Sequence, residues 1–390
     1  MSQTEHKPAV IAVVGGKLQG IEVLYLAAKA GYRTVLLDKN STPPALLLCD
    51  HFVQHHFSGA TPVPGNCPEI DLIVPAIEDD EVLSALKVWS DQSGIPLAFD
   101  LDAYAISSSK LKSDELFCQL QLPKPKPWPE CGFPLLIKPD SDSGSRGVTV
   151  CCNEDELARY RNDASGTSPQ VMQEYLEGPS YSIEIIGTPG NYLPLAITEI
   201  HMDSVYDCKR VTAPVEIPES SRQELEAMAV TLADTVKLKG IMDLEVICHQ
   251  GVMKPLEIDA RFPSQTPIAV YWATGLNMVK ILCDIFISNH TIGEYCIDYR
   301  RCASFEHILV KDGQVEVLGE HIMATGTPLW LARDFFGADE ALTTYRPGLR
   351  SWVATMIFTG NSQEAISVKR EKAYARIKAL GEGNTLETKP

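Results

Sequence analysis

Long apolar runs are missing from this sequence, and none reaches the roughly 18 residues that a membrane-spanning helix needs. A cationic, apolar leader is also missing at the N-terminus, so we expect a cytoplasmic protein that does not bind a membrane. Positive charge is scarce, because 34 Lys and Arg stand against 51 Asp and Glu and give a net charge of -17. No dense basic stripe offsets this, which argues against nucleic acid as a partner.

The eleven cysteines lack the spacing of a metal site or a redox motif. Cys151 and Cys152 are adjacent, unlike the pair of a CxxC motif, and no Cys/His grouping has zinc spacing. Others, such as Cys248 and Cys283, lie in apolar runs. We expect these to be buried thiols in a reducing compartment.

The composition is that of a globular protein with real cores. The chain has 390 residues, of which 45% are hydrophobic and 22% charged, which is enough for two or three domains. A small-molecule substrate suits such a protein better than a polyanion does.

The first hundred residues alternate strand and helix patterns. Residues 9–14 form an apolar strand, GGKLQG is a glycine-rich turn, and helical spacing follows from Ile21 to Gly31. Further strands are expected at YRTVLLDKN, DLIVPAI and IPLAFD, with a helix near residues 80–90. The pattern predicts a Rossmann-like domain over residues 1–102, with an open parallel sheet and helices on its faces.

The rest of the chain predicts α+β structure in two parts. Residues 103–122 have a polar helical pattern, and the strands FPLLIKP, GVTVCC, QVMQEYL and SYSIEIIG suit an antiparallel sheet in a central domain, 103–300. A smaller α+β part, 301–390, contains the strands SFEHILV and SWVATMIF and the charged helix QEAISVKREKAYARIKAL.

Two short acidic runs carry the strongest chemical signal. In LEIDARF, the alternate residues Glu257, Asp259 and Arg261 share one face of a strand, and in GIMDLEV so do Asp243 and Glu245. If these strands pair, four carboxylates and one guanidinium converge. Crowded carboxylates repel one another unless a cation lies among them. Mg²⁺ bound together with nucleotide phosphates is the natural candidate for that cation. The alternative is a hairpin whose acids face water.

A candidate phosphate loop, DSDSGSRG, lies upstream of the acidic runs. Its small residues let phosphates approach the backbone amides, and Lys138 stands two residues ahead of it. Taken alone, the loop could be a flexible hairpin. Lys110 and the strand QVMQEYLEG are weak signals alone, the first for a phosphate contact and the second for an adenine hinge.

The turn GGKLQG offers a competing interpretation. It resembles a dinucleotide fingerprint, with Asp38 in the place of a ribose-binding acid, and so suggests an NAD-dependent oxidoreductase. Its spacing is G-G-x-x-x-G rather than G-x-G-x-x-G. The same turn could bind a substrate carboxylate at a helix N-terminus.

The order of these elements resembles the ATP-grasp ligase superfamily over essentially the whole chain. The strings VVGGKLQGIE, VYDCKRVTAP, LKGIMDLE and IEIDARFPSQTP look like the ligases of pyrrolysine biosynthesis, which join 3-methyl-D-ornithine to the ε-amine of L-lysine. The resemblance implies an ATP-grasp fold with a pre-ATP-grasp domain in front. It also implies an ATP- and Mg²⁺-dependent ligase that forms an amide through an acyl phosphate. Other ATP-grasp chemistry, such as dipeptide ligation or a purine-pathway carboxylation, is the nearer alternative.

The resemblance also implies roles for individual residues. Glu245, Glu257 and Asp259 would bind Mg²⁺, with Asp259 where Asn is usual, and Arg261 and Lys138 would act in catalysis. Ser180 stands where many members have a ribose-binding acid. The implied ATP-binding residues are Lys110, Lys138, Ser141, Ser143, Gly144, Ser145, Gln173, Glu174, Tyr175, Leu176 and Ser182.

Substrate contacts are expected on both sides of these acidic runs. A substrate carboxylate or backbone could contact Lys17, Leu18 and Gln19. The candidates for binding ammonium groups are Glu22, Glu78, Glu184 and Asp243. The candidates for closing over the reacting carboxylate are Ser264, Gln265 and Thr266. His201, Asp203, Tyr206 and Asp207 match the family pattern without an assigned role. The superfamily also makes a homodimer plausible.

Overall fold

The N-terminal part is a parallel α/β layer. The computed structural model describes residues 8–58, 67–141, 147–163, 169–288, 292–324 and 327–381. The first elements are β1 (Val10–Val14), α1 (Leu18–Lys29), β2 (Arg33–Asp38), η1 (Leu46–Leu48), β3 (His51–Gln54), β4 (Leu72–Pro75) and α2 (Asp80–Ser93). The strands pair in parallel in the order β3-β2-β1-β4, and every residue of β1 is buried, as both faces of such a sheet require. This confirms the predicted open sheet, although IPLAFD contributes only a bridge between Ile73 and Leu97.

The helical pattern of residues 103–122 is two helices rather than one. They are α3 (Leu101–Ser107) and α4 (Lys110–Gln119). Ser109 separates them because its hydroxyl accepts the Lys112 amide at 3.2 Å, which starts α4 as an N-cap. The same hydroxyl donates to Asp140 at 2.9 Å, which ties the start of α4 to the strand that carries Lys138.

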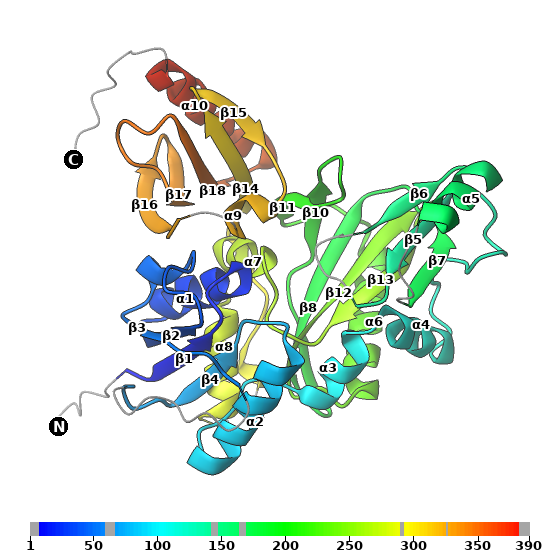
Figure 1. Cartoon of the computed structure of the whole chain (residues 1–390), viewed down its shortest axis with the longest axis horizontal. Coiled ribbons are helices and arrows are strands. Elements are labelled where there is room, and N and C mark those ends of the chain that lie inside the picture. The colour runs from blue at the N-terminus through cyan, green and yellow to red at the C-terminus, as the bar shows by residue number, and fades with distance from the viewer. Residues whose placement is uncertain are drawn as a thin grey trace.

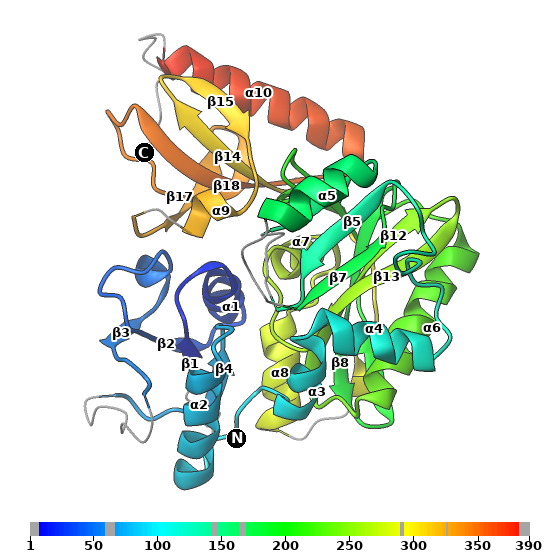
Figure 2. The ribbon, with the colours of Figure 1, turned by 45° about the vertical axis from the view of Figure 1, so that its right-hand side comes forward.

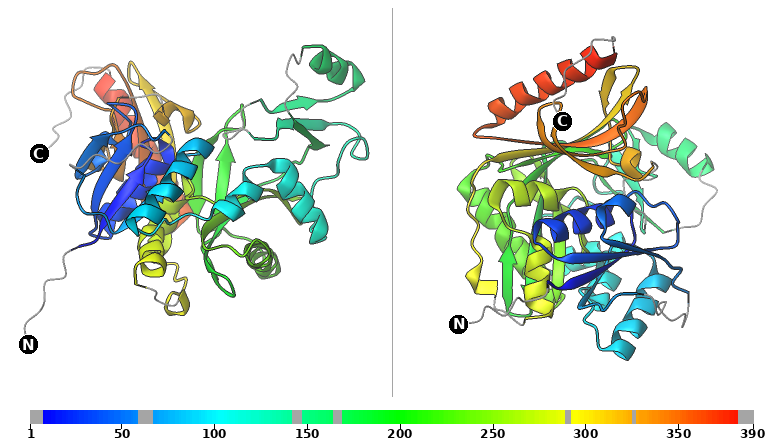
Figure 3. Two further views of the ribbon diagram at one scale, coloured as in Figure 1. Left: turned by 60° about the horizontal axis from the view of Figure 1, so that its bottom comes forward. Right: turned by 90° about the vertical axis from the view of Figure 1, so that its left-hand side faces the viewer.

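A small antiparallel sheet follows these helices. It has the order β6-β5-β7 and consists of β5 (Leu135–Pro139), β6 (Thr149–Cys151) and β7 (Gln170–Glu174), with α5 (Glu154–Asp163) beside it. In Figure 1 it lies to the right of the large sheet, on the side away from the N-terminal layer. The left panel of Figure 3 shows the same separation.

The large sheet is antiparallel and continuous across residue 300. Its main path is β13-β12-β8-β10-β11-β14-β18-β17-β16, with β9 on β8 and β15 on β14. The strands are β8 (Ser180–Thr188), β9 (Asn191–Pro194), β10 (Thr198–Met202), β11 (Cys208–Ala213), β12 (Gly240–His249), β13 (Val252–Asp259), β14 (Cys302–Lys311), β15 (Gln314–Val317), β16 (Trp330–Phe335), β17 (Ala338–Thr343) and β18 (Ser351–Gly360). The expected central and C-terminal parts therefore share one sheet, and the boundaries 1–102, 103–300 and 301–390 stay predictions.

The remaining helices connect these layers. They are α6 (Glu219–Thr235), α7 (Thr266–Thr274), α8 (Met278–Phe286), η2 (Ile292–Glu294), α9 (His321–Ala324) and α10 (Gln363–Gly381). Although α7 and α8 come late in the chain, they pack against α1, and their apolar side chains join one core with the N-terminal layer. Figure 2 shows these helices beside α1, below the C-terminal strands. This packing brings the start of α7 to Glu22 on α1.

Two predictions from composition can be compared with the structure. Among the described residues, no single helix passes the length and hydropathy test for a membrane span, and only the bent pair α7 and α8 passes together. All eleven cysteines are free, but only Cys151, Cys208 and Cys283 are buried. The expectation of a buried thiol is thus correct for Cys283 and wrong for Cys248, which is half-buried near the end of β12, where the strand approaches the surface.

Candidate active site

The acidic strands pair as the alternation predicts. In the β12–β13 hairpin, Asp243 lies opposite Asp259 and Glu245 lies opposite Glu257. Between Glu245 and Val246 the register shifts, because Val246 faces Pro255 and Leu256 is left over as a bulge. Proline has no N–H to donate, and β13 is the edge strand of the sheet, where such a break is tolerated.

The bulge creates a contact between the hairpin and the small sheet. Lys138, on β5 and only 7% exposed, donates from Nζ to the carbonyl oxygen of Leu256 at 3.2 Å. Lys110 Nζ lies 3.2 Å from Glu257 Oε2. Two ammonium groups therefore lie next to the hairpin, one from α4 and one from β5.

Arg261 bridges the hairpin to the N-terminal layer. Its Nη2 donates to Asp259 Oδ2 at 2.9 Å, and its Nε lies 2.6 Å from Glu78 Oε1. Gln19 donates to the same Glu78 oxygen at 2.7 Å. Arg261 lies beyond the end of β13, so the alternation of the strand only partly explains its position, and Glu78 follows β4 in an unrelated loop.

The hairpin carries more negative charge than its neighbours neutralise. Burial raises the pKa of Glu245, and the nearby carboxylates Glu257 and Asp259 raise it further. Burial also raises the pKa of Asp259, against the opposing effect of Arg261. For Glu257 the burial effect is outweighed by Lys110 and Lys138, which hold its pKa below the usual value. A set of hard oxygen donors with excess charge fits Mg²⁺.

A cavity of about 580 Å³ lies between the small sheet and the large sheet, next to these acids. Leu136, Val148, Met202, Ile247 and Leu256 give it apolar walls, and Lys110, Lys138, Glu245 and Glu257 lie at its polar part. This volume is within the range of small-molecule and cofactor sites. A nucleotide would match both parts of the cavity, with its aromatic base between the apolar walls and its phosphates next to the charged groups.

The predicted adenine hinge lines this cavity. Gln173, Glu174, Tyr175 and Leu176 are all wall residues. Glu174 accepts from Lys254 at 2.6 Å and from the Lys126 amide at 3.1 Å, which fixes the end of β7. The Tyr175 amide donates to Pro134 O at 3.3 Å, whereas the Leu176 amide has no backbone acceptor within the described part of the chain. The Leu176 amide is therefore the one that could donate to a ligand.

The other predicted ATP-binding residues differ in position. Ser143, Gly144 and Ser145 lie outside the described residues. Ser141 is exposed and does not line the cavity, and Ser182 is buried away from it, with its hydroxyl donating to Glu184 Oε1 at 3.2 Å. These two predictions of a direct contact gain no support.

Several cavity residues are absent from the ATP-binding residues that the sequence implied. Ser180 lines the cavity with a buried hydroxyl that has no hydrogen-bond partner in the described part of the chain. The other residues of this kind lie on β10 and β11 and are Glu199, His201, Lys209 and Arg210. Burial, followed by Arg210 and Lys209, lowers the pKa of His201 to about 4, so this ring is neutral at pH 7. The alternation of Glu199 and His201 in the sequence indicates that both side chains share one face of a strand. The sequence around them does not show which ligand that face would contact.

The predicted substrate residues divide into two groups. Glu78 contacts Arg261 and accepts from Gln19. Glu22 instead accepts the amides of Gln265 and Ile268 at 3.2 and 3.0 Å and so caps α7. That use competes with the predicted binding of an ammonium group by Glu22, because both of its oxygens already accept backbone N–H groups. Lys17 is exposed, and Leu18 packs against the core.

Three groups deeper in the site carry unused polar atoms. Glu184 Oε2, Asp243 Oδ1 and Thr266 Oγ1 are buried without a hydrogen-bond partner among the described residues. Burial raises the pKa of Glu184 to about 7. Ser264 and Gln265 stand just before α7, and Gln265 has a positive φ of 78°. Buried polar atoms in this state are typical of a site that a polar ligand completes.

The glycine-rich turn does not form a dinucleotide site. Asp38 accepts the Gly16 amide at 2.7 Å and the Asn40 amide at 2.7 Å. Cβ atoms added at Gly15 and Gly20 would lie 2.4 Å from Ala76 O and 2.1 Å from Gly15 O. The glycines thus allow the close packing of the turn. Asp38 accepts hydrogen bonds from that turn, so both features that suggested an oxidoreductase have a structural explanation.

Comparisons with known proteins show the family of this chain. The family model described as an ATP-grasp domain matches residues 107–265. Over 387 residues the chain is 31% identical to the 3-methyl-D-ornithine–L-lysine ligase of Methanosarcina mazei, covering 95% of each. The ligase of the same name from Methanosarcina acetivorans is also 31% identical, over 94% of this chain and 97% of the relative.

Solved structures extend the comparison to the fold. The biotin carboxylase domain of the Hydrogenobacter thermophilus 2-oxoglutarate carboxylase, determined with MgADP and bicarbonate, has a TM-score of 0.70. It is 16% identical, and the match covers 94% of this chain and 90% of that one. The fold is therefore of the ATP-grasp type throughout.

Proposed function

Because this chain belongs to the family of 3-methyl-D-ornithine–L-lysine ligases, we propose that it joins the carboxylate of 3-methyl-D-ornithine to the ε-amine of L-lysine at the expense of ATP. The proposed catalytic centre is the β12–β13 hairpin with Lys110, Lys138 and Arg261. The nucleotide would occupy the cavity beside it.

One observation carries the substrate assignment: several carboxyl groups near Arg261 lie outside the lining of the nucleotide cavity. Glu78 contacts Arg261, Asp243 acts on the charge of Arg261, and Glu184 lies opposite Asp243 on β8. Among the described residues, Glu184 Oε2 and Asp243 Oδ1 are buried and have no hydrogen-bond partner. Each diamino acid brings two ammonium groups, which would pair with these carboxylates and satisfy those oxygens. A carboxylase for bicarbonate has no such need for acids.

The residues suggest how the first step proceeds. The substrate carboxylate attacks the γ-phosphorus of ATP, the bond to the β-phosphate oxygen breaks, and ADP leaves an acyl phosphate. Lys110 and Lys138 offset charge on the phosphate oxygens as two point charges. Mg²⁺, held by Glu245, Glu257 and Asp259, would supply further positive charge there.

The second step makes the amide bond. The neutral ε-amine of lysine attacks the acyl carbon, and the C–O bond to phosphate breaks as the amide forms. In this proposal Arg261 stabilises the oxyanion of the tetrahedral intermediate, and the ion pairs of its guanidinium with Asp259 and Glu78 support that role.

The proposal predicts a product that mass spectrometry detects. With ATP, Mg²⁺, D-ornithine and L-lysine, we expect ADP together with an amide-linked ornithyl-lysine. D-Norvaline, which has the same chain without the side-chain amine, should react at least about tenfold more slowly, because one buried carboxylate then stays unpaired. L-Ornithine is the matched control for chirality.

Two results would argue against the proposal. No ADP above background would contradict a ligase for these substrates. Equal turnover of D-ornithine and D-norvaline would show that the acidic residues do not select a diamino acid. A homodimer and a cytoplasmic location also stay proposals, the second supported by eleven free thiols.

A further inference from the structure

A carboxyl group from the C-terminal part of the chain reaches this site. Glu320 lies in the turn between β15 and α9, far in sequence from the hairpin. Its Oε2 atom is buried and has no hydrogen-bond partner among the described residues, although Ser264 and Gln265 lie next to the carboxyl group. Arg261 is near enough for Glu320 to act on its charge. Nothing in the steps described above uses this group.

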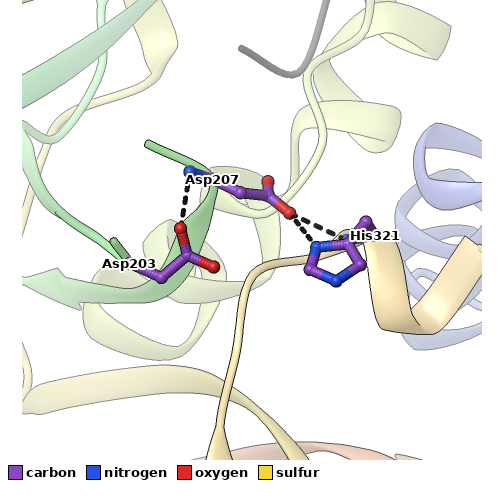
Figure 4. A group of neighbouring side chains, drawn as sticks. All are labelled: Asp203, Asp207 and His321. Carbon is purple, nitrogen blue, oxygen red and sulfur yellow. Dashed lines mark hydrogen bonds and ion pairs between the residues drawn. The ribbon is translucent and has the colours of Figure 1, made fainter. Parts of the chain in front are cut away.

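Two aspartates hold the turn on both sides of Glu320. The Gly319 amide donates to Asp203 Oδ2 at 3.1 Å, and the His321 amide donates to Asp207 Oδ2 at 3.1 Å. His321 Nδ1 also lies 2.5 Å from Asp207 Oδ2, as Figure 4 shows. Asp203 and Asp207 come from the β10–β11 connection, so this contact joins the ATP-grasp region to the C-terminal part.

The sequence of the turn is adapted to this contact. A Cβ atom added at Gly319 would lie 2.1 Å from Asp207 Oδ2 and 2.3 Å from its Cγ. Any side chain there would push the turn away from Asp207. The glycine thus allows the close approach that sets the position of its neighbour Glu320.

The same three side chains could be taken for a metal site, since their ligand atoms lie within 4.8 Å of one another. Their hydrogen bonds argue against that use. Asp203 Oδ1 accepts the amides of Val205 and Asp207, and the Oδ2 atoms of both aspartates accept the amides of the turn. The group therefore has a complete structural role in positioning residues 319–321.

We propose that Glu320 binds the amine of the acceptor amino acid and takes up its proton, and that Asp203 and Asp207 hold it in place for this. The inference rests on the proposed ligase function. Arg261 contacts Glu78 on the N-terminal layer at 2.6 Å, and Glu320 on the C-terminal part also acts on the charge of Arg261. With the acyl donor on the Glu78 side, the acceptor approaches the acyl carbon from the Glu320 side.

The charge environment of Glu320 suits this role. Burial raises its pKa to about 7, with Asp207 adding to the rise and Gln265, Arg261 and Ser264 opposing it. Glu22 and Cys208 are also near enough for the charge of Glu320 to act on them. Near neutral pH the carboxylate can accept one proton from the ε-ammonium. The neutral amine then attacks, its second proton leaves with phosphate, and Glu320 returns its proton to solvent.

The test compares two nucleophiles. Hydroxylamine is largely neutral at pH 7 and traps the acyl phosphate as a hydroxamate without a base. In Glu320→Gln, we expect amide formation with lysine to fall by about 100-fold or more, while hydroxamate formation from D-ornithine stays within about twofold of wild type. The remaining lysine reaction should rise about tenfold per pH unit, as more free amine forms. Glu316→Gln, on exposed β15, is the matched control and should leave both rates unchanged.

Gly319→Ala and Asp203→Asn test the positioning of Glu320. They should lower the lysine reaction selectively, as Glu320→Gln does, and a thermal shift with MgADP reports that each variant is folded. Equal loss of amide and hydroxamate in folded Glu320→Gln, or loss of neither, would overturn the proposal. If wild type itself makes no hydroxamate from D-ornithine, the proposed function fails instead.

Discussion

Replacing Glu257 by glutamine is expected to lower amide formation by roughly 1,000-fold or more. Lys110 and Lys138 hold the pKa of Glu257 below its usual value, so this carboxylate is charged at neutral pH. Glutamine keeps its size but removes that charge. The several kcal/mol that a bound metal ion contributes to charge stabilisation correspond to about this loss.

The nucleotide affinity separates a metal ligand from a general defect. In Glu257→Gln, ADP without Mg²⁺ should bind about as well as to wild type, but the gain on adding Mg²⁺ should disappear. Isothermal titration with and without the metal measures both values. Glu224→Gln, on the exposed face of α6, is the control. Unchanged turnover in Glu257→Gln would show that this carboxylate does not bind the metal.

Replacing Arg261 by lysine is expected to lower the rate of ligation by roughly 100- to 1,000-fold, the usual effect of losing an oxyanion donor. The positive charge remains, but the planar guanidinium that joins Asp259 and Glu78 is lost. Arg261→Met should also unfold at a lower temperature, because both carboxylates then lack their cation.

Steady-state kinetics and thermal unfolding together test this assignment. The lysine variant should keep most of its stability while losing kcat, and the methionine variant should lose both. Arg300→Lys, at an arginine side chain that is 63% exposed, should change neither. If Arg261→Lys kept full activity, the guanidinium would have a structural role only.

The hairpin could be predicted because its signal is local. Alternation along a strand places Glu257 and Asp259 on one face, and pairing with Asp243 and Glu245 follows from the short connection between the strands. The bulge at Leu256 was not predictable in detail, although Pro255 marks where the ladder breaks. The contact of Lys138 with the Leu256 carbonyl depends on that bulge.

The residues that only the structure reveals come from other elements. Glu320 is a single acid in a turn, and its sequence has no period or motif that separates it from surface acids. It reaches the site only because β14 and β18 extend the large sheet past residue 300. The sequence also could not show that Glu22 has a structural role. Glu22 caps the start of α7, which is more than two hundred residues away in sequence.

The acyl phosphate is the central claim, and oxygen labelling tests it most directly. D-Ornithine carrying ¹⁸O in both carboxylate oxygens is incubated with ATP, Mg²⁺, L-lysine and the enzyme, and the released phosphate is analysed by mass spectrometry. Attack of the carboxylate on the γ-phosphorus predicts one ¹⁸O atom in the phosphate for each amide formed. Unlabelled phosphate alongside the amide product would contradict the account.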